Sequence, residues 1–367
     1  MIHKAFLIVK IFLVGCICTV FSHFLNHTKL YAQDFDSEWQ EISLQLDSGK
    51  IQSAQELILQ IKEKATKQRN SPQIIKAIIH EAALSSNGKE PNGKESLITI
   101  YNALSTLQHD ADKAVLHTIL AELLWKYYES SAEEIQSRPQ FIPKNPQDFT
   151  FAELDNWDAL YFRKAIEHYT NQVLNTYASL QNISIKTYAD IVKVQKTAEY
   201  LRPTLYDILA FKLITIWEQI ERNQGRSDKA EFTDPLVLSK KTQYLQLPIS
   251  SLKGNNLYES PTLRIASLYQ HILHVHSLDK NQTASTDADI HRLLSLYSRL
   301  FHPDADSIII GALLEIGNST IIDDATPQAL VEAALLYKNR EQFQKAMEIC
   351  NDVQKRFPQT VAAERCK

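Results

Sequence analysis

Apolar side chains recur every three to four residues along most of the chain from Asp34 onward, a period that predicts amphipathic α-helices. Trp39, Ile42 and Leu46 mark one face of a first helix, which the polar run 47–50 ends. The same spacing predicts further helices, whose apolar positions include Leu57, Ile58, Ile61, Leu97, Leu107, Val115, Tyr128, Leu160, Phe162, Ile166, Tyr169, Val173, Leu205, Leu209, Leu213 and Trp217. The pattern therefore predicts an all-α fold.

Several predicted helices begin with a serine or threonine followed by proline. Such a pair places an N-cap side chain before a proline at the first helical position. We therefore expect the N-caps of three helices to be Ser71, Ser260 and Thr326. Thr150 and Glu153 have the spacing of a capping box and predict the start of one more helix.

Two stretches interrupt the helical pattern. Residues 131–149 contain three prolines and predict a surface linker, and residues 224–258 have the weakest helical pattern, with 245–249 compatible with an extended segment. The chain is therefore predicted to have five parts. They are a signal peptide (1–33), N-terminal helical hairpins (34–130), a linker (131–149), a long-helix region with an irregular tail (150–258) and C-terminal tetratricopeptide-like helices (259–367).

The C-terminal region contains one segment, residues 327–358, with the length and spacing of a tetratricopeptide repeat. Its packing positions are Leu330, Ala333, Ala334, Tyr337, Ala346 and Pro358. The first four give the first helix its large, small, small, large pattern, the alanine of the second helix allows a close crossing, and the proline ends that helix. Because a helical hairpin cannot bury its apolar face alone, we expect it to stack on its neighbours. Elsewhere the match is looser, so the prediction is an irregular tetratricopeptide-like solenoid.

The first 33 residues predict an export signal. Lys4 and Lys10 precede the apolar run 11–24, and residues 30–32 resemble a cleavage site. The run is shorter than the roughly 20 apolar residues of a spanning helix. We expect cleavage, with an uncleaved anchor or a lipoprotein modified at Cys16 as alternatives. The chain is thus predicted to be exported to the periplasm or cell envelope, or secreted, and to touch a membrane only through this segment.

Composition narrows the functional classes. The apolar fraction is 44%, which excludes general disorder. Only 8 glycines occur in 367 residues, which favours helices over hairpin-rich sheets. The formal net charge of -4 gives no electrostatic reason to bind nucleic acid.

Histidines 271, 274, 276 and 291 are the one group with a metal-site composition. His271 and His274 share a helix face, whereas His276 points elsewhere, and a zinc site would need a pair four residues apart or a carboxylate at fixed spacing. We expect solvated or capping histidines instead.

Acidic side chains and catalytic motifs give no stronger signal. Asp207, Glu218 and Glu221 lie on one predicted helix, where acids are usually solvated. The sequence contains no His-Glu-x-x-His, Gly-x-Ser-x-Gly or phosphate-binding loop. We therefore predict no catalytic residue, no metal and no cofactor.

Two cysteines, Cys350 and Cys366, follow the signal region. Cys350 falls on an apolar helix face, so a buried free thiol is the simpler interpretation. In an exported protein the alternative is a disulfide between the two.

Two strings, at residues 156–162 and 201–210, occur together with an exported start, an early tryptophan helix and a closing pattern over 357–366. In this combination the chain resembles the N-terminal helical region of bacterial alpha-2-macroglobulin-like proteins, over roughly residues 38–367. The resemblance implies an exported endopeptidase inhibitor that traps proteases. The Cys-x-Glu-Gln thioester of many members is missing, so no inhibitory residue is transferred to this chain. Residues 362–367 read as a helix that continues, which led us to expect the N-terminal part of a longer protein.

The expected function is therefore a non-catalytic scaffold or docking region of such an inhibitor, with a protease or envelope protein as partner. The alternative is a free-standing exported tetratricopeptide-type adaptor. A helical enzyme that uses the histidines is a third and weaker hypothesis.

Overall fold

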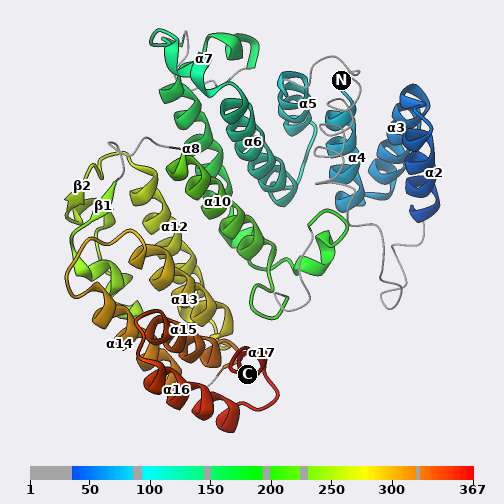
Figure 1. Cartoon of the computed structure of the whole chain (residues 1–367). Helices are drawn as coiled ribbons and strands as arrows, with labels where there is room; N and C mark the ends of the chain where they lie inside the picture. The colour runs from blue at the N-terminus through cyan, green and yellow to red at the C-terminus, as the bar shows by residue number, and fades with distance from the viewer. Residues whose placement is uncertain are drawn as a thin grey trace, which may run out of the picture. The chain divides into compact units, whose positions relative to one another are not determined.

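The structure is a computed structural model that describes residues 35–85, 93–143, 149, 151–192, 199–223, 230–319 and 323–367. It is mostly helical, which confirms the predicted all-α class (Figure 1). The helices form two compact units, one in residues 1–194 and the other in residues 195–367. The predicted signal segment lies outside the described residues. Within the described part of the chain, no helix has both the length and the apolar character needed to cross a membrane.

Unit 1 is a series of helices in which neighbours along the chain pack together. Its elements are α2 Asp36–Asp47, α3 Ile51–Gln68, α4 Ser71–Leu84, α5 Lys94–Leu104, α6 Asp110–Ser130, α7 Ala132–Ser137, η1 Phe151–Asn156, α8 Ala159–Asn175, α9 Tyr177–Leu180 and η2 Ile185–Tyr188. Each of α2 to α5 packs on the next, and α6 packs along α8. Buried aromatic rings lie where α6 and α8 pack together. Among them are Trp157 and Phe162, whose ring centroids are 5.3 Å apart.

Unit 2 follows the same principle of successive packing. Its helices are α10 Leu205–Arg222, α11 Lys241–Tyr244, α12 Pro261–Val275, α13 Thr283–Tyr297, α14 Ala305–Gly317, α15 Thr326–Asn339, α16 Phe343–Arg356 and α17 Val361–Arg365, with η4 Pro235–Leu238, η5 Ile249–Ser251 and η6 His276–Leu278 between them. From α12 to α17 each long helix packs on the next, and α15 also reaches α13 and α17. The described residues contain one small antiparallel pair, β1 Glu231–Phe232 with β2 Gly254–Asn255.

Helix caps agree with the sequence at one of the three predicted sites. The Ser260 hydroxyl accepts a hydrogen bond from the Leu263 amide at 3.1 Å, as expected. At the second site the cap is Asn70, one residue earlier, because Ser71 donates its hydroxyl to Asp112 instead. At the third site Thr326 is the first helical residue and not the cap, and the Asp323 carboxylate accepts its amide at 2.9 Å.

The predicted linker and irregular tail also differ in detail from the structure. Residues 132–137 of the linker form α7, and α6 and α8 on its two sides pack directly together inside unit 1. The segment 245–249, expected to be compatible with an extended conformation, instead forms the turn after α11 and the first residue of η5. Thr150 of the predicted capping box lies outside the described residues, while Asp158 caps α8 through the Tyr161 amide at 2.8 Å.

Candidate functional site

The C-terminal hairpin of α15 and α16 contains the residues that the repeat pattern singled out, except for Pro358, which follows it. Leu330, Ala333, Ala334 and Ala346 are buried, whereas Tyr337 is half-buried and Pro358 is exposed just after α16. The apolar contacts of the hairpin centre on Leu330, Val331, Val353 and Ala362, so they join α15, α16 and α17.

The first half of α16 has an exposed apolar face. Phe343 is 58% exposed and Met347 is 65% exposed, and their spacing of four residues places both on one side of the helix. The second half is covered differently, because α17 packs there and Gln354 donates a hydrogen bond to the Cys366 carbonyl at 2.8 Å. A helix side that carries two large apolar residues in water is suited to a contact with another molecule.

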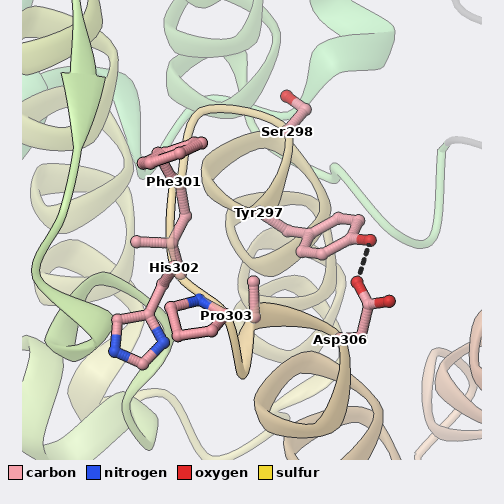
Figure 2. Close-up of a pocket in the computed structure, with 8 residues that line it drawn as sticks. Tyr297, Ser298, Phe301, His302, Pro303 and Asp306 are labelled. Atoms are coloured by element: carbon pink, nitrogen blue, oxygen red, sulfur yellow. Dashed lines mark hydrogen bonds between the residues drawn. The ribbon is translucent and has the colours of Figure 1, made fainter.

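The loop between α13 and α14 borders a hollow of about 510 Å³. Its walls are formed by Tyr297, Ser298, Leu300, Phe301, His302, Pro303, Ala305 and Asp306. Figure 2 shows the phenol of Tyr297 hydrogen-bonded to Asp306, with Phe301, His302 and Pro303 along the loop. Phe301 is 72% exposed, so this hollow offers a second aromatic side chain to solvent.

Arg340, directly after α15, contacts two residues that line the hollow. Its Nε donates to Asp306 at 2.5 Å and its Nη2 donates to the Tyr297 hydroxyl at 2.6 Å. The hydrogen bond from Arg340 holds the pKa of the Asp306 carboxyl below its usual value. Phe343 follows Arg340 by three residues, which limits its Cα to about 10 Å from that of Arg340. We call the exposed side of α16 that carries Phe343 and Met347 the apolar edge.

The histidines do not converge. His271 shares a hydrogen bond of 2.6 Å with the Tyr206 hydroxyl, and burial lowers the pKa of His271. His274 is exposed, and His291 of α13 lies 3.0 Å from Arg202 Nη2. His276 is buried between two carboxylates, as described below. Among the described residues, no three His, Cys, Asp or Glu side chains are grouped as metal ligands.

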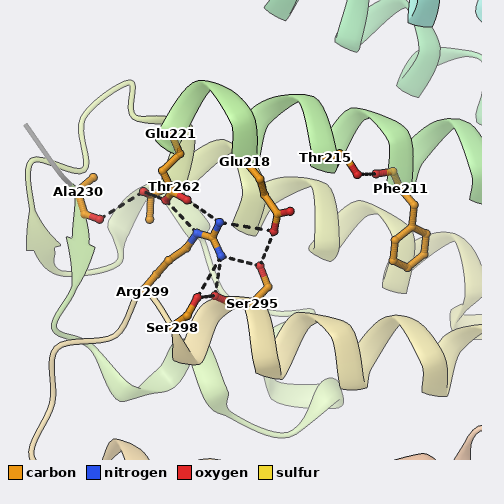
Figure 3. A network of polar contacts seen from close by, with 9 residues as sticks. All are labelled: Phe211, Thr215, Glu218, Glu221, Ala230, Thr262, Ser295, Ser298 and Arg299. Atoms are coloured by element: carbon orange, nitrogen blue, oxygen red, sulfur yellow. Dashed lines mark hydrogen bonds and ion pairs between the residues drawn. The ribbon is translucent and has the colours of Figure 1, made fainter. Parts of the chain in front are cut away.

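The acidic side chains of α10 are partnered and largely buried, not solvated as expected. Asp207 caps its own helix through the Thr204 amide and hydroxyl. Glu221 accepts two hydrogen bonds from Arg299, at 2.9 and 2.5 Å, and Glu218 lies beside the same guanidinium (Figure 3). Thr262 donates to both Glu221 and the Ala230 carbonyl, and so joins α12 to this network.

Sequence reasoning missed the apolar edge and Arg299. A spacing of four marks Phe343 and Met347 as one face, but only the structure shows that nothing else in the described chain covers that face. Glu221 and Arg299 are 78 residues apart, and no local pattern pairs them.

No family model, curated protein or solved structure matches this chain.

Proposed function

We propose that this chain is a non-catalytic helical scaffold that binds a protein partner, and that an amphipathic helix of the partner docks on the apolar edge. The observation that carries the proposal is the exposure of Phe343 and Met347 on one side of α16. Helix-in-groove recognition uses anchors spaced by three, four and seven residues, and this side of α16 presents matching positions.

The neighbouring half of α16 supports a helix as the occupant. There α17 packs on the hairpin of α15 and α16, and its small side chains Ala362 and Ala363 are 4% and 2% exposed. Two helices can approach closely where one presents small residues. A partner helix along the first half of α16 would bury Phe343 and Met347 by the same kind of packing.

The arrangement of unit 2 supports an irregular tetratricopeptide-like solenoid as the framework. Helices α12 to α17 pack in chain order, and α15 contacts the helices two places before and after it. Stacked hairpins of this kind hold partners on extended surfaces and need no reacting groups.

The wider role rests on the sequence resemblance. In that proposal the chain is the scaffold or docking region of an exported alpha-2-macroglobulin-like protease inhibitor, and the partner is a protease or an envelope protein. The free-standing adaptor is the second candidate, and the same docking chemistry serves both. Neither role requires nucleic acid, a metal or a cofactor.

The test uses a displayed library of amphipathic helical peptides and the full chain. The dissociation constant of the tightest peptide is measured by fluorescence anisotropy with wild type and with Phe343→Asp/Met347→Asp. Burial of an apolar side chain contributes about 1.5–3 kcal/mol, so the double variant should lose about 3–6 kcal/mol and bind at least roughly 100-fold more weakly.

A matched control is available in unit 1. Leu44 and Leu59 are 59% and 52% exposed, close to the values of the two residues on α16. The variant Leu44→Asp/Leu59→Asp should leave the dissociation constant unchanged. A library that yields no binder, or an equal loss in both variants, would contradict the proposed docking site.

A further inference from the structure

The last helix, α17, is held by few contacts for an element that closes the hairpin. It has five residues, and a helix of this length has little stability of its own. Ala362 and Ala363 are buried against the hairpin, and Arg365 pairs with Glu332 at 2.9 Å on the exposed side. The position of α17 therefore depends on tertiary contacts.

Two thiols lie at the contact between α17 and α16. The structure records Cys350 of α16 and Cys366, directly after α17, as free and half-buried. Cys366 packs against the apolar cluster of the hairpin together with Ile349, the residue before Cys350, and its carbonyl accepts a hydrogen bond from Gln354, one turn after Cys350. The two cysteines thus lie on parts of α16 and the α17 segment that pack together, and both are partly open to solvent.

We propose that Cys350 and Cys366 form a reversible disulfide clasp that fastens α17 to α16. Cys350 lies three residues after Met347 on the same helix face, so the clasp closes beside the apolar edge. Its effect on partner binding rests on the proposed function, whereas formation of the bond does not.

The reaction is a thiol–disulfide exchange with a small-molecule disulfide such as oxidised glutathione. One of the two cysteines, as its thiolate, attacks one sulfur of the oxidant and releases one thiolate. The other thiol then loses its proton to water, attacks the protein sulfur of the mixed disulfide and releases the second thiolate. Two protein thiols become one disulfide, and the oxidant becomes two thiols.

The test oxidises the full chain in buffers of defined reduced and oxidised glutathione. Trypsin should yield residues 346–355 linked to residues 366–367, a pair that dithiothreitol separates. Hydrogen exchange of the amides in 361–367 should be at least about tenfold slower in the oxidised chain, because the bond restricts opening of α17. Cys350→Ser should show neither the linked peptides nor the slower exchange.

Three results would overturn the clasp: separate glutathione adducts on the two cysteines, a bond from either one to Cys16 or Cys18, or unchanged exchange in the linked chain. Binding of the selected helical peptide is measured separately in both redox states. The oxidised chain should bind the peptide at least about threefold more tightly, because α17 is already fixed and loses less conformational entropy when the peptide binds. Equal binding by the two states would overturn the regulatory part alone, and loss of all peptide binding would count against the docking site and not against the bond.

Discussion

The Nε2 of His276 lies 2.6 Å from Oδ1 of Asp207, and both side chains are almost completely buried. The other ring nitrogen, Nδ1, lies 2.7 Å from Oδ2 of Asp279. Both ring nitrogens can donate at once only when the imidazole carries a proton on each. This geometry therefore favours imidazolium, and His276 is an ion-paired link between α10 and the end of α12.

This link predicts a definite pH dependence of stability. Burial by itself lowers the pKa of His276, but the hydrogen bonds and charges of Asp207 and Asp279 outweigh it and raise the pKa above the ordinary 6.5. A raised folded-state pKa stabilises the protein fully below about pH 6.5, and this contribution is lost as the pH rises through the folded-state value. The unfolding free energy of wild type minus that of His276→Gln should therefore fall as the pH increases above 6.5.

The expected size of that difference at pH 6 is about 2–3 kcal/mol, because the substitution leaves Asp207 buried without its charged donor. Urea unfolding from pH 5 to 9 measures it. A difference that grows with pH would show that His276 is neutral in the folded protein. Nitrogen NMR at pH 6 gives an independent check, since both ring nitrogens of His276 should be protonated there.

The ion pair of Arg299 and Glu221 should be a sensitive polar contact of unit 2. Their side chains are 9% and 10% exposed, so Arg299→Met leaves a buried carboxylate without its partner and should cost about 3–5 kcal/mol. Arg299→Met/Glu221→Gln should recover a large part of the loss. Lys240→Met breaks an exposed pair with Glu315 and should change stability by less than about 1 kcal/mol. A double variant as unstable as the single one would contradict the ion-pair explanation.

Unit 1 has a comparable buried contact between Tyr188 and Asp112. The Tyr188 hydroxyl donates to Asp112 at 2.6 Å, and Ser71 donates to the other carboxylate oxygen at 2.8 Å. Tyr188→Phe removes one donor from a carboxylate that is 2% exposed and should cost about 1–3 kcal/mol in thermal or urea unfolding. Tyr128→Phe, which removes an exposed contact with Gln136, should stay within about 0.5 kcal/mol. Equal losses of unfolding free energy in the two variants would show that the hydrogen bond from the Tyr188 hydroxyl to Asp112 does not stabilise the fold.

The sequence was sufficient for features that depend on neighbouring residues. The three-to-four-residue apolar spacing predicted the long helices, and Ser260 before Pro261 predicted the cap of α12. The other two caps failed for different reasons. The Ser71 hydroxyl donates to Asp112, a partner 41 residues along the chain, whereas Asp323, only three residues before Thr326, accepts the Thr326 amide in its place.

Less of the candidate site could be predicted from the sequence, because it depends on contacts between residues that are distant along the chain. Buried charges such as Glu221 look solvated on a helical projection until the partner that buries them is known. Exposure of Phe343 and Met347 is likewise a property of the packed hairpin and not of α16 alone. Local rules thus predicted where helices form, and tertiary packing determined which of their side chains remain available.

Close packing of α14 on α15 gives the sharpest test of the hairpin, through two glycines of one helix. A Cβ on Gly317 would lie 2.3 Å from Cδ2 of Leu330, whereas a Cβ on Gly311 would meet nothing within 4 Å. Gly317→Ala should therefore force Leu330 out of its place and destabilise the chain by about 1–3 kcal/mol. Gly311→Ala should stabilise it by about 0.5–1 kcal/mol, because alanine loses less backbone entropy in a helix. Urea unfolding of both variants measures these two changes in unfolding free energy, which should have opposite signs. If Gly317→Ala were neutral, α14 and α15 would have to be farther apart than the structure places them, and the packing role of Leu330 would be lost with it.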